Sequence, residues 1–194
     1  CCFNQNNKIT PNIFDIWMRI LKTVDKSVLW LLEDNSIAIK NLRKEAKKRK
    51  IDPKRIIFAK RMSMTNHFAR HKCADLFIDT FPYGAHTTCS DSLWAGLPIV
   101  TLMGKSFASR VGSSLLNAIN LKELITTTEK EYEKLIIELA NNSYRLKEIR
   151  SKLHKNRFTK PLFDTKLYTK NIELAYTKIY EKHLNKLPAK NIDI

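Results

Sequence analysis

The residues best suited to bind an anionic ligand are His86, Thr87 and Thr88. They follow the predicted strand at residues 75–79 through a short loop and open a predicted helix. The free N–H groups of a first helical turn and the positive end of the helix dipole attract phosphate groups. Two hydroxyls and an imidazole add further hydrogen-bond donors. This turn therefore predicts a phosphate site.

Asp91 lies one helical turn beyond these residues, where a carboxylate can hold a ribose hydroxyl. The same pattern fits a purely structural interpretation, in which Thr87 or Thr88 caps the helix and Asp91 completes a capping box. His86 also fits a loop histidine that bonds only to its neighbours. The local pattern alone leaves both interpretations open.

Strands and helices alternate along the chain on short connections. The predicted strands cover residues 27–32, 55–58, 75–79 and 97–102. The predicted helices begin at Thr10-Pro11 and then cover residues 36–50, 65–73, 87–95, 106–119, 129–141, a continuation at 142–155, and 164–187. This alternation predicts an α/β fold with a Rossmann-like parallel sheet and flanking helices. Ligands of such sheets bind at the carboxyl ends of the strands, where the turn at His86 lies.

The composition favours anionic partners and argues against a membrane protein. The net charge is +16 over 194 residues, which is enough chain for one domain with an apolar core. The basic residues are spread from Lys40 to Lys190 and form no single stripe, so nucleic-acid binding is not expected as the primary function. No apolar run approaches the roughly 18 residues that a membrane-spanning helix needs.

The cysteines predict neither a metal site nor a disulfide framework. The four cysteines Cys1, Cys2, Cys73 and Cys89 form no CxxC pair, and no Cys/His cluster completes a zinc site. We interpret them as reduced thiols of a cytoplasmic protein, which is favoured over a catalytic cysteine.

A longer run around the phosphate turn carries a family pattern. The run reads DLFIDTFPYGAHTTCSDSLWAGLPIVTLMGKSFASRVGSSLL. It resembles the C-terminal catalytic lobe of O-linked N-acetylglucosamine transferases and their bacterial and plant relatives. In that family an Asp-Thr strand end precedes Gly-His-Thr-Thr, an Asp, Leu-Trp-Ala-Gly-x-Pro-x-Val-Thr and Ser-Arg-Val. Here Ala85 stands between Gly84 and His86. The segments FNQNNKI, SVLWLL, RIIF and PLFDTKLYTKNIELAY extend the resemblance over residues 3–184.

The resemblance implies a GT-B fold, in which two Rossmann-like lobes hold a nucleotide sugar between them. It implies transfer of N-acetylglucosamine from UDP-GlcNAc to Ser or Thr of proteins, with inversion and without a metal or other cofactor. Residues 1–187 are expected to form the nucleotide-sugar-binding C-terminal lobe, followed by a tail at 188–194. The partners expected are the UDP-sugar, a protein acceptor, an N-terminal catalytic lobe and upstream tetratricopeptide repeats. We expect a larger protein, and an isolated lobe that is inactive.

The resemblance also assigns roles to residues of this chain. Lys8 is expected to be catalytic, because negative charge grows on UDP as the sugar leaves. The remaining matches predict donor binding: Gln5 beside the diphosphate, His86, Thr87 and Thr88 on the diphosphate and sugar, Asp91 on the ribose, and His67 and Arg70 near the uridine.

One position departs from the family pattern. Met64 stands three residues before His67, where the family usually has a nucleotide-contacting Lys. Methionine cannot donate a hydrogen bond or neutralise phosphate, so Lys60 or Arg61 would have to compensate. Two alternatives therefore stay open: a related glycosyltransferase that uses another sugar nucleotide or makes an N-linkage, and a non-catalytic anion-binding module.

Overall fold

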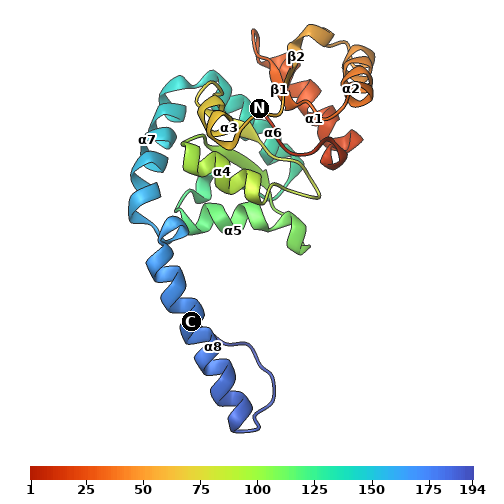
Figure 1. The fold of residues 1–194 in the computed structure, drawn as a ribbon. Coiled ribbons are helices and arrows are strands. Elements are labelled where there is room, and N and C mark those ends of the chain that lie inside the picture. Colours follow the sequence, from red (N-terminus) through yellow and green to blue (C-terminus); the bar gives the residue numbers. More distant parts are fainter.

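The computed structural model describes residues 1–194 and confirms the alternation of strands and helices (Figure 1). The strands are β1 (Leu29–Leu32), β2 (Ile56–Ala59), β3 (Phe77–Ile78), β4 (Ile99–Leu102) and β5 (Ile125–Thr126). The helices are α1 (Pro11–Thr23), α2 (Ser36–Lys48), α3 (Met64–His71), α4 (Thr87–Ala95), α5 (Val111–Ala118), α6 (Glu129–Asn141), α7 (Ser143–Thr159) and α8 (Thr165–Leu184). The short strand β5 was not predicted.

All strand pairs are parallel, as the sequence predicts. Strand β1 pairs with β2, and β3, β4 and β5 form a second group in that order. The N-terminal residues lie between the two groups, because Cys2 pairs in parallel with Leu31 and the Cys1 carbonyl accepts a hydrogen bond from the Ile78 N–H at 2.9 Å. The chain end is thereby placed beside β3, whose carboxyl end leads to the predicted phosphate turn.

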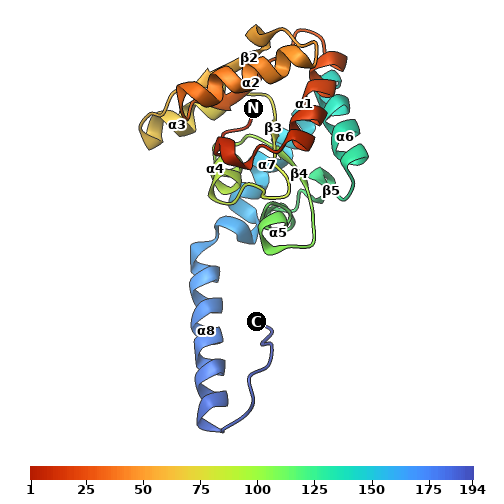
Figure 2. The ribbon, with the colours of Figure 1, turned by 90° about the vertical axis from the view of Figure 1, so that its right-hand side faces the viewer.

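Helix α1 supplies much of the core on one side of the sheet. Thr10 caps it by accepting a hydrogen bond from the Ile13 N–H, and Pro11 occupies the first helical position. Its apolar face is buried and packs beside α6, as Figure 2 shows. The Trp17 indole N–H donates to the Tyr132 hydroxyl at 3.1 Å, so the buried polar atoms of this contact are paired.

Two predicted helix boundaries were wrong. The single helix predicted at 106–119 is a 3₁₀ turn at Phe107–Ser109 followed by α5, which begins at Val111. Residues 142–155 were predicted to continue the helix at 129–141, but they belong to a separate helix, α7. The Asn142 side chain starts it by accepting a hydrogen bond from the Arg145 N–H, which is a common way to begin a new helix.

Helix α8 projects away from the rest of the molecule (Figures 1 and 2). The predicted long helix is present, but none of its residues is buried, and Leu167, Leu174 and Ile179 of its apolar face are exposed. The tail at 188–194 forms no helix or strand and returns along α8, where Lys178 Nζ donates to the Asp193 carbonyl. Neither α8 nor any other helix combines the length and apolar character needed to cross a membrane.

Candidate functional site

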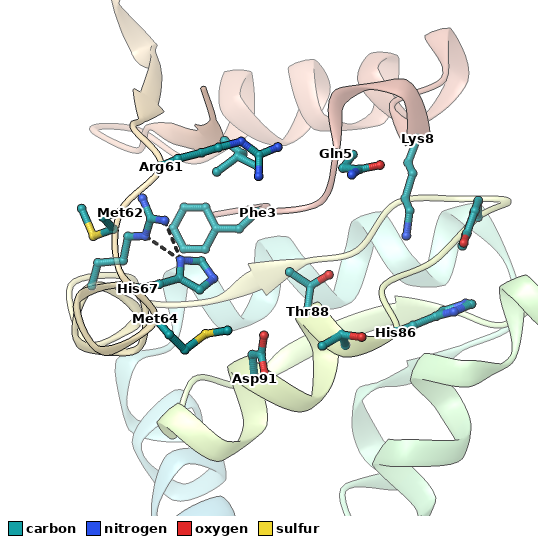
Figure 3. A pocket seen from close by; sticks show the side chains of 14 residues that line it. Phe3, Gln5, Lys8, Arg61, Met62, Met64, His67, His86, Thr88 and Asp91 are labelled. Atoms are coloured by element: carbon teal, nitrogen blue, oxygen red, sulfur yellow. Dashed lines mark hydrogen bonds between the residues drawn. The ribbon is translucent and has the colours of Figure 1, made fainter. Parts of the chain in front are cut away.

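A cavity of about 570 Å³ lies where the N-terminal segment, α3 and the start of α4 meet (Figure 3). Side chains from segments that are far apart in the sequence line it. All eight predicted site residues are among its lining residues: Gln5, Lys8, His67, Arg70, His86, Thr87, Thr88 and Asp91. The structure therefore brings the predicted set together, while the role of each residue stays a prediction.

The first turn of α4 leaves backbone donors available. The first N–H that bonds within the helix is that of Cys89, which reaches the His86 carbonyl at 3.0 Å. The N–H groups of Thr87 and Thr88 consequently have no partner inside the helix. No side chain caps this end; instead, the Thr88 hydroxyl donates to Asn4 Oδ1 at 2.8 Å. The alternative interpretation of Thr87 or Thr88 as a helix cap was therefore wrong.

His86 sits at the N-cap position between two aromatic rings. Its Nε2 lies 3.2 Å from the Ala108 carbonyl oxygen, which can only accept a hydrogen bond, so this nitrogen carries the proton. The ring centroids of Tyr83 and Phe107 are 5.1 and 5.9 Å away. His86 is thus held by the chain through Nε2 while its ring lines the cavity.

A buried carboxylate organises the loop before α4. Asp79 is 1% exposed, and its Oδ1 accepts hydrogen bonds from Asn4 Nδ2 at 3.1 Å, Thr80 N at 2.8 Å and Ala85 N at 2.7 Å. The Thr101 hydroxyl donates to Oδ2 at 2.7 Å. Burial raises the pKa of Asp79, and these four hydrogen bonds oppose the rise. The sequence marked Asp79 only as a strand end, so its organising role was missed.

Asn4 connects the N-terminal segment to this network. It is buried and also donates to Thr80 Oγ1 at 2.7 Å. The following residues form a 3₁₀ turn at Asn6–Lys8, which carries Lys8 to the cavity. Beyond the turn, the Thr10 hydroxyl donates to the Phe81 carbonyl at 3.1 Å. The segment is thus tied to the loop before α4 on both sides of Lys8.

The Lys8 ammonium lies on the loop that leads to α4. Its Nζ donates to the Gly84 carbonyl at 3.0 Å and lies 3.8 Å from the centroid of the Tyr83 ring. Partial burial lowers the pKa of Lys8, and the negative charge of Asp79 opposes that shift. No carboxylate forms an ion pair with Lys8, so its charge remains available to an anion. Tyr83 was not predicted as a site residue.

His67 and Arg70 form a pair on α3. The Arg70 Nε–H donates to His67 Nδ1 at 2.8 Å, and its Nη1 donates to the Lys60 carbonyl at 2.7 Å. Because a guanidinium only donates, His67 Nδ1 must accept, and the neutral ring carries its proton on Nε2. Figure 3 shows the His67 ring directed into the cavity.

This pair changes the expected role of Arg70. The residue is only 8% exposed, and the chain itself occupies its guanidinium, which also lies 5.0 Å from the Phe3 ring centroid. Burial lowers the pKa of His67 to about 4, and electrostatic repulsion from the neighbouring His71 and Arg70 side chains lowers it in the same direction. The His67 ring is therefore neutral at neutral pH. Arg70 therefore fixes the orientation and tautomer of His67 and has little guanidinium surface left for a ligand.

Two predicted ligand contacts have no partner within the chain. Asp91 is half-buried and makes no hydrogen bond, and its burial raises the pKa of its carboxyl group. The Gln5 side chain is exposed at the start of the 3₁₀ turn and makes none either. Both side chains are therefore free to bond to a molecule in the cavity.

The opposite end of the cavity is formed by exposed side chains. Met64 is 61% exposed and Met62 is 46% exposed, whereas Leu32, which also lines the cavity, is buried. Arg61 extends along this end (Figure 3) and contacts Asp34 at 3.4 Å. Lys60 does not line the cavity. Of the two basic residues considered as replacements for the missing family Lys, only Arg61 is placed to contact a ligand.

Metal-binding and cysteine chemistry find no support in this cavity. No group of three or more His, Cys, Asp or Glu side chains is arranged to hold a metal ion, and metal independence itself stays a prediction. All four cysteines are free thiols. Burial raises the pKa of Cys2 to about 12 and that of Cys89 well above its usual value, which disfavours the reactive thiolate at both positions.

Comparisons with known proteins agree with this geometry. The chain is 35% identical over 192 residues to the "UDP-N-acetylglucosamine--peptide N-acetylglucosaminyltransferase" of Caenorhabditis elegans, a match that covers 99% of this chain and 17% of that protein. It is 38% identical over 183 residues to the Arabidopsis thaliana protein named "Probable UDP-N-acetylglucosamine--peptide N-acetylglucosaminyltransferase SEC", covering 94% of this chain and 19% of that protein. The chain thus spans about a fifth of these curated relatives.

A solved structure shows the same fold. The "Thermobaculum terrenum O-GlcNAc transferase mutant - K341M" superimposes with a TM-score of 0.88 at 29% identity, over 92% of this chain and 35% of that one. The predicted fold class, a Rossmann-like lobe of the GT-B type, is confirmed. Residues 1–172 match the family described as Glycosyl transferase family 41. These matches confirm the resemblance to O-linked N-acetylglucosamine transferases, and the chain belongs to glycosyl transferase family 41.

Proposed function

We propose that the cavity binds the diphosphate of a nucleotide sugar, UDP-GlcNAc, at the N-terminus of α4. The observation that carries the proposal is the convergence of Lys8 with the unpaired N–H groups of Thr87 and Thr88 on one cavity. A helix N-terminus attracts phosphate, and an ammonium without a carboxylate partner adds a full positive charge. The Thr87 hydroxyl and the His86 ring line the same end.

In the whole protein, this site would serve the inverting transfer of N-acetylglucosamine to Ser or Thr of a protein acceptor. Negative charge develops on the leaving UDP as its bond to the sugar breaks, and Lys8 and the α4 dipole would stabilise that charge without a metal ion. The proton of the acceptor hydroxyl must pass to a general base, a role that the proposal gives to an N-terminal catalytic lobe. The named activity of the relatives supports this reaction class.

The other predicted contacts fit the remaining parts of the donor. Asp91, which has no partner in the chain, would accept a hydrogen bond from a ribose hydroxyl. His67 would meet the base with its Nε2–H, because Arg70 occupies Nδ1. Gln5 would reach the diphosphate from the N-terminal segment. Upstream tetratricopeptide repeats would recruit the acceptor.

A second candidate is a glycosyltransferase that uses another sugar nucleotide or makes an N-linkage. The exposed side chains of Met64 and Met62 favour it, because they offer apolar surface where the family pattern has a Lys. A third candidate is an anion-binding module without catalysis, which would rest on the net charge of +16.

Calorimetric titration with UDP tests the proposal. We expect Lys8→Ala to weaken binding by about tenfold or more, since hydrogen bonds from charged groups contribute about 1.5–3 kcal/mol. Thr87→Ala should weaken it by about threefold, on the scale of a neutral hydrogen bond. Lys44→Ala, which removes an exposed lysine of α2 outside the cavity, is the matched control and should change nothing.

The result that rejects the proposal is absence of UDP binding at millimolar concentration, or binding that Lys8→Ala and Thr87→Ala leave unchanged. A parallel series with UDP-GlcNAc, UDP-glucose and a GDP-sugar separates the first two candidates. Preference for UDP-GlcNAc supports the first, and preference for another donor supports the second.

A further inference from the structure

Tyr83 is an aromatic residue whose ring lies between two predicted ligand contacts from different segments. It is 48% exposed and lines the cavity from the loop between β3 and α4. The Lys8 Nζ lies 3.8 Å from its ring centroid, and the His86 ring centroid is 5.1 Å away on the same loop. An ammonium at this distance is attracted to the negative face of an aromatic ring.

The backbone around Tyr83 is fixed by buried neighbours. The Thr80 hydroxyl donates to the Tyr83 carbonyl at 2.7 Å, and the Gly84 N–H donates to the Ala108 carbonyl at 3.0 Å. A Cβ atom at Gly84 would lie 3.0 Å from Asp79 Oδ2, so a side chain there would require the buried carboxylate to shift. The backbone at Tyr83 is therefore set by the fold, which limits the space in which its ring can lie.

Lys8 needs such a support, because a lysine side chain has four flexible carbons and loses about 2 kcal/mol of rotamer entropy when it is fixed. A carboxylate would hold the ammonium but would also neutralise it and compete with a phosphate ligand. The contacts seen here, a ring face and the Gly84 carbonyl, hold the ammonium and leave its net charge intact.

We propose that Tyr83 is a positioning residue that holds the Lys8 ammonium at the N-terminus of α4 without neutralising it. This inference rests on the proposed function, namely that the cavity binds the diphosphate of a nucleotide sugar. Tyr83 acts through Lys8, so its contribution to ligand binding depends on the presence of that side chain.

A double-mutant cycle with UDP as the titrant tests this dependence. Tyr83→Leu removes the ring face and should weaken UDP binding by about two- to fivefold, the range expected for an exposed cation–π contact. Tyr83→Phe keeps the ring face and should bind UDP as the unaltered chain does. In the Lys8→Ala background, Tyr83→Leu should have no further effect. Tyr144→Leu, at an exposed tyrosine of α7 outside the cavity, is the matched control.

A proton NMR measurement on the ligand-free chain tests the geometry separately. The ε-methylene protons of Lys8 should show an upfield ring-current shift in the unaltered chain and in Tyr83→Phe, and should lose it in Tyr83→Leu. Absence of that shift overturns the inference, as does an equal loss of UDP affinity on Tyr83→Leu with and without Lys8. If the unaltered chain does not bind UDP, the proposed function fails, and Tyr83 then has no ligand-positioning role even where the shift is present.

Discussion

The two ends of the cavity are built in opposite ways. At the anchored end, residues 3–8 and 79–88 are joined by hydrogen bonds of the buried Asn4 side chain to Asp79, Thr80 and Thr88. At the open end, residues 61–64 present exposed side chains whose one ion pair, between Arg61 and Asp34, is long at 3.4 Å. The geometry of the proposed phosphate contacts therefore depends on the fold. The open end depends on side chains alone, so substitutions there should change ligand preference while leaving the fold intact.

The largest expected effect comes from breaking the anchored end. Asp79→Ala leaves three N–H donors and the Thr101 hydroxyl without their buried acceptor, so we expect a loss of about 3 kcal/mol in the free energy of unfolding, measured by urea denaturation. UDP binding should weaken as well, because the N-terminal segment that carries Lys8 and the loop before α4 lose the buried carboxylate that joins them.

Asp79→Asn is the matched control for this prediction. Its side-chain oxygen can still accept from the three N–H donors, and the Thr101 hydroxyl can turn to accept from the amide. Because burial disfavours the Asp79 charge, the neutral amide should cost about 1 kcal/mol or less. Equal stability of the Ala and Asn variants would contradict the importance of these hydrogen bonds.

The next effect concerns His67 on α3. Burial holds its pKa at about 4, below the value of roughly 6.5 in an unfolded chain. The folded chain therefore binds fewer protons than the unfolded chain in this interval, and stability is lost as the pH falls from about 6.5 toward 4. His67→Gln keeps an acceptor for Arg70 but does not titrate.

From pH 7 to pH 5, the unaltered chain should lose about 1 kcal/mol more free energy of unfolding than His67→Gln, once solvent screening of the half-buried ring is allowed for. The comparison with the variant is needed because other groups titrate too. His71, whose pKa burial also lowers, changes stability in the same direction, and Asp79, with its raised pKa, changes it in the opposite one. Parallel pH profiles of the two proteins would show that His67 is not held neutral.

A smaller effect is expected from adding charge to the open end. Met64→Lys places an ammonium where the family pattern has one, and we expect UDP binding about three- to tenfold tighter, with a steeper dependence on salt. The melting temperature should not change, because Met64 is exposed. Asn66→Lys adds the same charge to α3 outside the cavity and serves as the control. If both variants bind UDP more tightly by the same factor, the added charge acts through the net charge of the chain and not through a contact in the cavity.

The smallest effect is expected from Arg61→Ala. The side chain is 65% exposed and its ion pair with Asp34 is long, so stability should change by less than about 0.5 kcal/mol. UDP binding measured by calorimetry should weaken by about twofold. If Arg61→Ala reduces UDP affinity more than Lys8→Ala does, the open end and not the anchored end contributes most to UDP binding.

The sequence predicted the parts of the site that are local in the chain. The order of strands and helices followed from hydrophobic patterning, and the helix at residues 87–95 was predicted with its observed bounds. The turn at His86 could be predicted as a phosphate site because a strand end, a loop and a helix start follow one another, and that role stays a prediction. Gln5 and Lys8 could be joined to it only through the family resemblance.

The parts that were missed depend on contacts between distant segments. The bond from Asn4 to Asp79 and the contact of Lys8 with Tyr83 exist because the N-terminal residues lie between β1 and β3. Arg70 could not be recognised as a support for His67 from its spacing alone. Helix α8 was predicted from its periodicity, which does not specify what covers its apolar residues, and in this chain Leu167, Leu174 and Ile179 are exposed.

A crystal structure of the chain with UDP would show where in the cavity the diphosphate binds. The proposal predicts diphosphate oxygens at about 2.7–3.2 Å from the N–H groups of Thr87 and Thr88 and from Lys8 Nζ, with the nucleoside toward His67 and Asp91. A diphosphate bound at the open end beside Arg61 and Met64, or UDP bound outside the cavity, would contradict it.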